Sequence, residues 1–418
     1  MDVIFAEATP PGRGGISIVR LSGPGSRRII EALVGPLQEA RRSYHRAVRV
    51  GDETIDHALV IRMEQGSSFT GEEMAELYLH GAPVVVRRVC QALAQIGARP
   101  AEPGEFTRRA FLNGRMDLAE IEGLGDLLAA ETEAQRKLAL RSTSGELAQK
   151  YTEWRQLLIR AGALIEASID FADEDIVEEV PEEVYSLIGE LRDELSRQLK
   201  GFEAAERIRI GFEVAIIGPP NAGKSSLLNA LASREVAIVS EFAGTTRDVL
   251  ELRLDLGGLA VTILDTAGLR DTEDQLEKAG INLAKRRAEA ADLRIHLSTK
   301  GECVPDLFRE GDLVVRSKAD KDGGPGISVV SGQGITELLS QLRSTLSLRI
   351  ADAGLISHQR QVHELQSASL ALEHEPDVAP EILAEKIRVA ALALDRLVGK
   401  VDAEDYLDQI FASFCVGK

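Results

Sequence analysis

The stretch "FEVAIIGPPNAGKSSLLNAL" (residues 212–231) carries the strongest structural signal in the chain. Its first six residues are mostly apolar and predict a buried strand, whereas "SSLLNAL" predicts the start of a helix. Between them, Gly218, Gly223, Lys224 and Ser225 match the phosphate-loop pattern G-x-x-x-x-G-K-[ST]. A chance glycine-rich turn would rarely have a strand before it and a helix after it. The sequence therefore predicts an α/β domain that binds a nucleoside triphosphate.

The chemistry of a phosphate loop assigns a role to each polar group in it. Glycines let backbone N–H groups face the phosphates, and the helix N-terminus adds positive potential. We expect Lys224 to reach the β- and γ-phosphates and the Ser225 hydroxyl to bind Mg²⁺. The nucleotide-binding residues expected from this loop are Asn221, Ala222, Gly223, Lys224, Ser225 and Ser226.

A second apolar run, "VTIL", ends at Asp265 and is followed by Thr266, Ala267 and Gly268. Downstream of a phosphate loop, an aspartate at a strand end is expected beside Mg²⁺, so all four residues are predicted nucleotide contacts. Leu269 then stands where Ras-type GTPases carry the glutamine that orients the attacking water. Because leucine cannot hydrogen-bond to water, another group must take that role.

The third nucleotide signal concerns the base. Guanine readers usually carry Asn-Lys-x-Asp after a strand, and this chain has Ser317, Lys318, Ala319 and Asp320 after "DLVVR". Asp320 keeps the carboxylate that accepts hydrogen bonds from guanine, whereas serine reaches less far than asparagine. We expect guanine as the base, with an affinity lowered by Ser317. Ser328 in "ISVVSGQGI" fits the last base-contacting loop.

Composition excludes several classes of protein. The 418 residues carry a net charge of −18, so contact with a polyanion such as RNA must be local or occur through a partner. Three widely spaced cysteines (Cys90, Cys303 and Cys415) argue against a disulfide framework or a cysteine-rich metal site. The start lacks a basic segment followed by a long apolar one, and no apolar run approaches the ~20 residues of a membrane span. A cytoplasmic protein is expected.

The chain length predicts several domains, and the hydrophobic pattern suggests their order. The expected segments are an α+β domain (1–116), the first part of a helical domain (117–210), a phosphate-loop α/β domain (211–346) and the second helical part (347–418). In the first segment, strands are expected within 15–21, 57–63 and 75–80 and a helix at 84–96. The fold class expected is thus multidomain, with an α/β domain inserted into an all-α one.

Motifs from all three regions together resemble one family. These are "ATPPGRGGISIVRLSG", "SFTGEE", "PGEFTRRAFLNGRMDLAEIEGLGDLL", "GPPNAGKSSLLNAL", "AGTTRDV", "DTAGLRDTEDQLEKAGI" and "FCVGK". They resemble the MnmE (TrmE) family of tRNA-modification GTPases, over the whole chain. The resemblance implies a folate-binding-like N-terminal domain that forms a homodimer. It also implies a heterotetramer with the FAD protein MnmG, which provides most of the contact with tRNA.

The reaction that the resemblance implies is the formation of an aminomethyl-type (carboxymethylaminomethyl) group at C5 of the wobble uridine of certain tRNAs. The one-carbon unit would come from 5-formyl- or methylene-tetrahydrofolate. The sequence leaves open which tRNAs are used and whether glycine or ammonium supplies the amine.

For hydrolysis, the resemblance implies that K⁺ replaces an arginine finger and that Glu277 orients or activates the water. The K⁺ ligands implied are Asn221, Ser240, Phe242 and Thr245, and the Mg²⁺ ligands are Ser225 and Thr246. Ser240, Thr245 and Thr246 also count as nucleotide contacts, and Lys224, Asn221 and Glu277 form the expected catalytic set. Without the resemblance, Asn221 would be read as a turn residue and Glu277 as a solvated helix position.

The implied folate ligands are Arg20, Glu76, Arg115 and Lys418. Taken singly, each arginine would be read as a surface charge, and the segment "LHGAP" after Glu76 departs from the glycine-rich family pattern. Cys415 is close to the folate site by resemblance. Either modification chemistry or a structural role is open for its thiol.

Two other functions fit parts of the sequence. A regulatory GTP switch in ribosome assembly would share the phosphate loop, but such proteins usually carry a basic RNA-binding domain. A folate-binding scaffold with a weak GTPase would fit the Ser317 departure. Folate binding separates the scaffold and the modification enzyme from the switch, and K⁺-stimulated turnover separates the enzyme from the scaffold.

Overall fold

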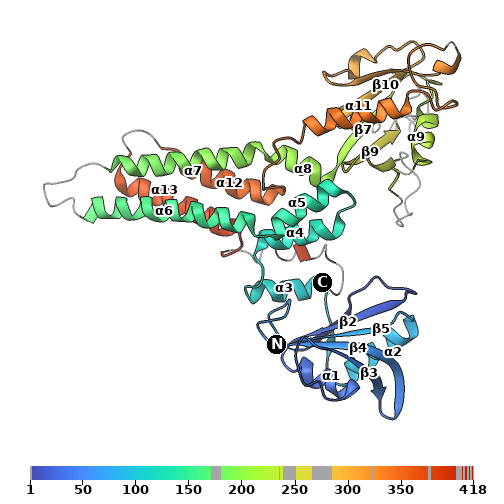
Figure 1. The fold of residues 1–418 in the computed structure, drawn as a ribbon. Coiled ribbons are helices and arrows are strands. Elements are labelled where there is room, and N and C mark those ends of the chain that lie inside the picture. The colour runs from blue at the N-terminus through green and yellow to red at the C-terminus, as the bar shows by residue number, and fades with distance from the viewer. Residues whose placement is uncertain are drawn as a thin grey trace, which may run out of the picture. The chain divides into compact units, whose positions relative to one another are not determined.

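The structure is a computed structural model that describes residues 2–170, 180–234, 236–238, 251–265, 285–321, 323–374 and 378–401, together with residues 407, 410, 411, 414 and 417. The chain divides into two compact units, seen in Figure 1. The first contains Met1–Gly125 and Asp395–Lys418, and the second contains Asp126–Leu394. Among the described helices, none is both long and apolar enough to cross a membrane.

The first unit is built on a six-stranded sheet in the order β3-β4-β5-β2-β1-β6. The pairs are antiparallel except β1 with β6. The strands are β1 (Ile4–Glu7), β2 (Ile16–Ser22), β3 (Ser43–Val50), β4 (Glu53–Met63), β5 (Met74–His80) and β6 (Arg99–Pro100). Its helices are α1 (Ser26–Val34), α2 (Pro83–Gln95) and α3 (Glu105–Leu112).

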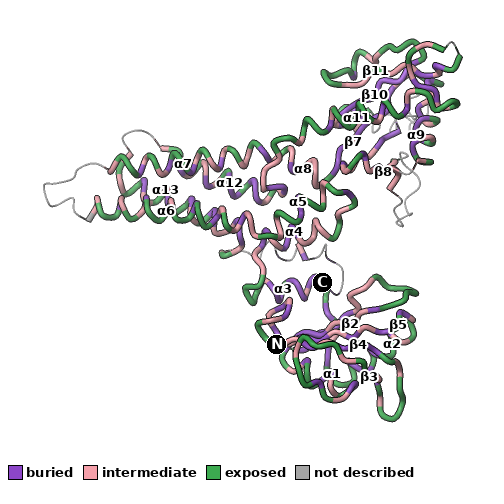
Figure 2. Tube along the Cα trace, viewed as in Figure 1, coloured by how far each residue is buried: buried purple, intermediate pink, exposed green. Residues whose placement is uncertain are grey.

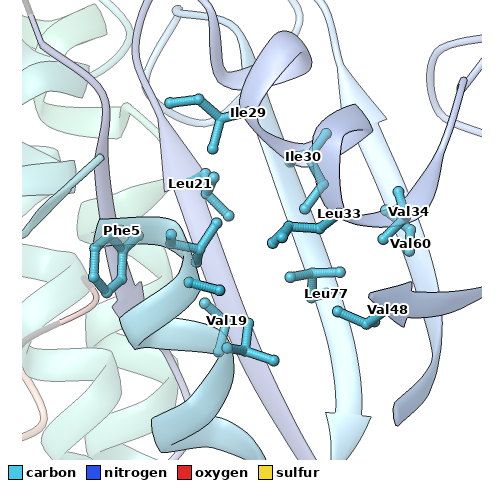
Figure 3. Close-up of a cluster of buried hydrophobic side chains, with 14 of the residues drawn as sticks. Phe5, Val19, Leu21, Ile29, Ile30, Leu33, Val34, Val48, Val60 and Leu77 are labelled. Atoms are coloured by element: carbon cyan, nitrogen blue, oxygen red, sulfur yellow. The ribbon is translucent and has the colours of Figure 1, made fainter. Parts of the chain in front are cut away.

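One face of this sheet packs against α1 and α2. Alternate residues of β2 and β5, such as Leu21 and Leu77, meet Ile30 and Leu33 of α1 in one fully buried cluster (Figure 3). Among the described residues, the other face is covered at one end only, where Phe106 of α3 packs on β1. We call it the half-covered face of the sheet.

The strands and the helix expected from the sequence in this unit are confirmed, but several elements were missed. Helix α1 was missed although Ile29, Ile30, Leu33 and Val34 have helical spacing, because it lies between two glycine-rich turns. Strand β3, "SYHRAVRV", was missed because polar and apolar residues do not alternate strictly in it: His45 and Arg46 are adjacent, as are Ala47 and Val48.

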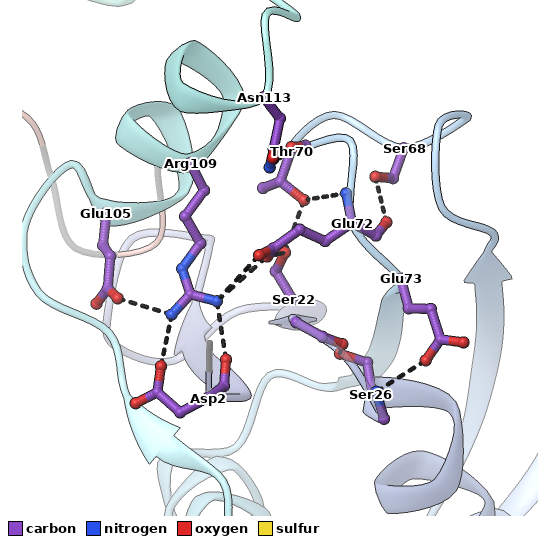
Figure 4. Close-up of polar contacts among 12 residues, drawn as sticks. Asp2, Ser22, Ser26, Ser68, Thr70, Glu72, Glu73, Glu105, Arg109 and Asn113 are labelled. Atoms are coloured by element: carbon purple, nitrogen blue, oxygen red, sulfur yellow. Dashed lines mark hydrogen bonds and ion pairs between the residues drawn. The ribbon is translucent and has the colours of Figure 1, made fainter.

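A buried arginine ties α3 to the sheet (Figure 4). Arg109, only 7% exposed, donates to Glu72 at 3.2 Å, to Glu105 at 3.0 Å and to Asp2 at 2.8 Å. Arg99 pairs with both Glu105 and Asp2 at 2.7 Å. Hydrogen bonds from Arg99 and Arg109 outweigh desolvation and hold the pKa of Asp2 well below its usual range. These ion pairs join the chain start, the loop before β5 and α3.

Further hydrogen bonds extend this cluster into the sheet. The Ser22 hydroxyl donates to Glu72 at 2.8 Å and lies 2.7 Å from the Thr70 hydroxyl. The Asn113 amide donates to the Thr70 carbonyl at 2.7 Å. The loop between β4 and β5 is therefore fixed from two sides, by β2 and by the end of α3.

The helical part of the second unit contains α5 (Glu133–Thr143), α6 (Glu146–Asp170), α7 (Glu182–Lys200), α8 (Phe202–Ile210) and α12 (Gln359–Ala371), while α4 (Leu118–Ala129) and α13 (Pro380–Leu397) each extend across the division between units. Helix α6 packs against α7, with Trp154, Leu158 and Ile165 buried at helical spacing, and Figure 2 shows the buried stripes. Helix α7 begins directly after Pro181.

The other part of this unit is a five-stranded sheet in the order β11-β10-β7-β9-β8. Its strands are β7 (Phe212–Ile217), β8 (Glu251–Asp255), β9 (Ala260–Asp265), β10 (Leu293–Ser298) and β11 (Leu313–Arg316), and its helices are α9 (Lys224–Ala232) and α11 (Ile335–Leu348). All pairs are parallel except β8 with β9. Because α7 before this sheet packs against α12 after it, the predicted insertion of an α/β domain into a helical one is confirmed.

The Arg109 cluster makes a stability prediction. Arg109→Met should lower the free energy of unfolding by about 3–5 kcal/mol, because it removes the Arg109 charge that pairs with the buried carboxylate of Glu72. Arg42→Met, at an exposed pair with Glu39, should cost at most about 1 kcal/mol. Urea unfolding of both variants measures the difference, and equal losses would contradict a special role for Arg109.

Acidification gives a second measure of the same cluster. Burial favours a raised pKa for Glu105, but hydrogen bonds from Arg99, the Glu102 amide and Arg109 bring its pKa below the usual value. A carboxyl group whose pKa is lowered in the folded state stabilises that state fully at pH values above its unfolded pKa of about 4. This stabilisation is lost as the pH falls further. The stability gap between wild type and Arg109→Met should therefore narrow below about pH 4.

Candidate functional site

The carboxyl ends of four parallel strands meet at one edge of the second sheet. The phosphate loop follows β7, Asp265 ends β9, and the base-reading segment follows β11. In open α/β sheets, ligands bind at this edge. The topology thus brings three motifs together that lie up to about a hundred residues apart in sequence.

The phosphate loop has a conformation that only some residues tolerate. Gly218 has a φ of 155°, and a Cβ atom there would lie 1.9 Å from the Leu297 carbonyl oxygen. Gly223 caps α9 with a φ of 97°, and Asn221 has a φ of 61°, which asparagine tolerates better than most residues. The two glycines are therefore required by the backbone, and the loop opens directly into the N-terminus of α9.

Lys224 lies folded under this loop and is only 8% exposed. Its Nζ donates to the carbonyl oxygens of Gly218 at 2.9 Å and of Pro219 at 3.2 Å. The Ser225 hydroxyl donates to Asp265 Oδ2 at 2.8 Å. The structure thus brings together Ser225 and Asp265, the hydroxyl and carboxylate that the sequence assigned to the same Mg²⁺ ion.

Both base-reading segments are joined by backbone hydrogen bonds. Ile327 N donates to Arg316 O at 2.7 Å, and Ala319 N donates to Ile327 O at 3.1 Å. Ser328 is fully buried beside this junction, whereas Asp320 is exposed. The two segments therefore lie side by side.

Ser317 is the unusual member of this site. Its N–H donates to the Ser298 carbonyl at 2.8 Å, and the residue is only 5% exposed. Within the described part of the chain, its hydroxyl oxygen is buried and has no hydrogen-bond partner. A buried unpaired hydroxyl costs free energy, so it is a natural contact for a ligand atom. The sequence showed the replacement of asparagine but not this unpaired hydroxyl.

The first unit holds two of the predicted folate ligands together. Arg20 on β2 lies directly opposite Glu76 on β5, and Arg20 Nε donates to Glu76 Oε1 at 2.9 Å. The Arg20 guanidinium carbon is 5.9 Å from the ring centroids of both Phe69 and Phe106, two residues that sequence reasoning missed. Arg20 also donates to the Gly417 carbonyl at 3.4 Å.

Among the described residues, Arg115 makes no hydrogen bond or ion pair with Arg20 or Glu76. It is exposed, and its side chain lies beside Gly71 in the loop between β4 and β5. Since Phe69 belongs to the same loop, this loop touches both predicted arginines. Ten other predicted residues lie outside the described part of the chain; they are Ser240, Phe242, Thr245, Thr246, Thr266, Ala267, Gly268, Glu277, Cys415 and Lys418.

The buried lysine makes a binding prediction. Lys224→Ala should weaken GTP binding about 10- to 100-fold, because a charge-assisted hydrogen bond to phosphate contributes roughly 1.5–3 kcal/mol. Lys321→Ala removes an exposed lysine near the base-reading segment and should leave the affinity within about twofold. Fluorescent GTP titration measures both. Unchanged affinity in Lys224→Ala would remove this lysine from the site.

The chain is similar to known proteins over its whole length. Residues 3–115 match the family described as GTP-binding protein TrmE N-terminus, and residues 118–415 match the MnmE helical domain. The chain is 59% identical to a tRNA modification GTPase MnmE of Paracoccus denitrificans and 50% identical to one of Cereibacter sphaeroides, with 100% of both sequences covered in each case. A solved structure of Aquifex aeolicus Era is 24% identical over 40% of this chain and 68% of its own, with a TM-score of 0.26.

Proposed function

Because this chain belongs to the MnmE family of tRNA modification GTPases, we propose that it hydrolyses GTP in the modification of tRNA at the wobble uridine. The observation that carries the proposal is the meeting, at one sheet edge, of the Lys224 loop, the Ser225–Asp265 contact and the two base-reading segments. No other arrangement among the described residues combines a phosphate loop with a carboxylate for Mg²⁺.

Ser225 and Asp265 fit Mg²⁺ by their chemistry, since this ion prefers hydroxyl, carboxylate and phosphate oxygens. When bound, Mg²⁺ would neutralise charge on the β- and γ-phosphates. Lys224 would exchange its bonds to loop carbonyls for phosphate oxygens, and Thr246 would complete the Mg²⁺ ligands from the protein. The backbone N–H groups at the start of α9 would face the same phosphates.

Guanine is the base that these residues favour. Asp320 is exposed and free to accept from the guanine N–H groups, and the Ser317 hydroxyl offers a second polar contact near the base. Because serine is shorter than asparagine, the Ser317 side chain extends less far toward the base. We therefore expect a modest affinity for guanine nucleotides. The same loss of contact, with the short stretch between Gly268 and Ser317, favours the alternative of a scaffold with weak turnover.

For charge stabilisation in hydrolysis, the proposal uses K⁺ in place of an arginine finger. Asn221 is exposed at the tip of the loop, in a left-handed conformation, and its amide oxygen is a suitable ligand. Ser240, Phe242 (through its carbonyl) and Thr245 would supply the others. When bound, K⁺ would place a positive charge beside the phosphates, where negative charge develops.

The cation hypothesis is tested by phosphate release from GTP and ATP in K⁺ and in Na⁺ at equal ionic strength. We expect hydrolysis of GTP, not ATP, and a rate at least about tenfold higher in K⁺, because removing one charge-stabilising contact costs about 1.4 kcal/mol or more. Asn221→Ala should lose the K⁺ preference. Asn229→Ala, on the exposed side of α9, should keep it. A retained preference in Asn221→Ala would refute its role as a ligand.

Glu277 is proposed as the group that orients the water in place of the missing glutamine. Glu277→Ala should lower kcat about 100-fold or more, as expected when a general base is lost, while nucleotide affinity stays within about twofold. Glu273→Ala, four residues earlier in the same segment, is the matched control and should hydrolyse GTP normally. Single-turnover hydrolysis with saturating enzyme separates chemistry from binding, and equal rates in the two variants would exclude Glu277.

The other half of the proposed function belongs to the first unit. Arg20 and Glu76, with Arg115 and Lys418, would bind 5-formyl- or methylene-tetrahydrofolate as the source of the one-carbon unit. Cys415 would lie close to that chemistry or hold the chain end in place. We further propose a cytoplasmic homodimer through the N-terminal domain that works with an MnmG-type flavoprotein, which provides most of the contact with tRNA. The four-segment division of the chain stays a prediction.

A further inference from the structure

The half-covered face of the first sheet changes from buried to open along β5. Met74 is buried, the side chain of Glu76 is 13% exposed, Tyr78 is half-buried and the side chain of His80 is 72% exposed. These four side chains share one face because successive residues of a strand alternate. The ion pair of Arg20 and Glu76 therefore lies where the covered part of the face ends and the open part begins.

Apolar side chains surround this ion pair on the open side. In the register of the sheet, Tyr78 lies between Leu59 of β4 and Ile18 of β2. Leu59 is 48% exposed and Ile16, next along β2 on this face, is 63% exposed. An apolar floor beside the ion pair of Arg20 and Glu76 suits a flat heterocycle that also carries polar N–H groups.

Tyr78 has a direct bond to this pair. Its hydroxyl donates to Glu76 Oε2 at 2.9 Å, while Arg20 Nε donates to Glu76 Oε1 at 2.9 Å. Burial, together with the hydrogen bond to Glu76, raises the pKa of Tyr78, so the hydroxyl keeps its proton and remains a donor. Two donors from neighbouring strands thus fix the two oxygens of one carboxylate.

A carboxylate held in this way still has free acceptor positions. Each of its oxygens can accept two hydrogen bonds, and each accepts one from the side chains described. Arg20 and Tyr78 fix the orientation of the carboxylate and therefore the directions in which its free acceptor positions point. A ligand with two adjacent N–H groups would meet a carboxylate that is already in place, so less rotational freedom is lost on binding.

We propose that Tyr78 is a positioning residue that holds the Glu76 carboxylate for the N–H edge of a planar heterocycle, such as the pterin of a reduced folate. The proposal rests on the folate role proposed above and adds to it the residue that sets orientation. Tyr78 acts through Glu76 and need not touch the ligand. Its loss should weaken binding of the pterin and spare the binding of the glutamate-bearing part of the cofactor.

The test uses Tyr78→Phe, which removes one oxygen and keeps the ring. Binding of tetrahydrofolate, of a tetrahydropterin alone and of p-aminobenzoylglutamate is measured by calorimetry on the full-length protein. We expect Tyr78→Phe to lose about five- to tenfold in affinity for the first two ligands and less than twofold for the third. Tyr44→Phe is the matched control. It removes another hydroxyl from the same sheet, one that accepts only from the Glu39 amide and donates weakly to the Glu39 carbonyl.

A double-mutant cycle separates positioning from a general structural effect. If Tyr78 acts through Glu76, Tyr78→Phe should cause no further loss in a Glu76→Gln background. Equal losses for all three ligands, additive losses in the cycle, or unchanged affinity in Tyr78→Phe would each overturn the inference. If the wild-type protein binds none of the three ligands, the folate role itself fails, and the inference with it.

Discussion

The close approach of strands β7 and β10 is the constraint on which the nucleotide site depends. Parallel pairing brings the Leu297 carbonyl so near to residue 218 that no Cβ atom fits there. Glycine at this point lets the chain leave β7, turn through Asn221 and enter α9 with its N–H groups directed outward. Lys224 is then the first residue of α9 and is buried under the loop. Sheet pairing thus determines where a phosphate can bind.

The same sheet edge explains why the motifs could be read from sequence. A strand, a glycine-rich loop and a helix are local features, and each contributes a signal within about twenty residues. Parallel strands end at one edge, so Asp265 and Ser317 were placed near the loop by topology alone. The unpaired hydroxyl of Ser317 was not predictable, because it depends on how β10 and the segment around Ile327 enclose that side chain.

The first unit was harder to predict, for a physical reason. Its sheet is open on part of one face, so several strands carry charged or apolar residues on both sides and lose the clear alternation of a half-buried strand. Arg109, Glu72 and Asp2 are far apart in sequence, and their ion cluster appears only when α3 packs on the sheet. Arg20 and Glu76 were named by resemblance. Their bond to each other follows from strand register, which the sequence does not reveal, whereas the bond between Tyr78 and Glu76 joins two residues of one strand.

In the proposed function, each unit performs a different kind of chemistry. The second unit binds and hydrolyses GTP at a sheet edge, and the first holds a one-carbon donor on an open sheet face. The net charge of −18 is consistent with tRNA bound mainly through a partner, since an acidic chain repels phosphates at long range. Membership of the MnmE family and the two proposed sites are consistent with a single reaction that needs both sites.

The most direct test of this combined function is a reconstituted modification reaction. The protein, an MnmG-type flavoprotein, unmodified tRNA, GTP, Mg²⁺ and K⁺ would be supplied with methylene-tetrahydrofolate labelled with ¹³C in its one-carbon unit, and the wobble nucleoside analysed by mass spectrometry. We predict a substituent at C5 of the wobble uridine that carries the ¹³C label and forms only when GTP is hydrolysed. A modified uridine without the label, or no modification despite active GTP hydrolysis, would contradict the proposed function.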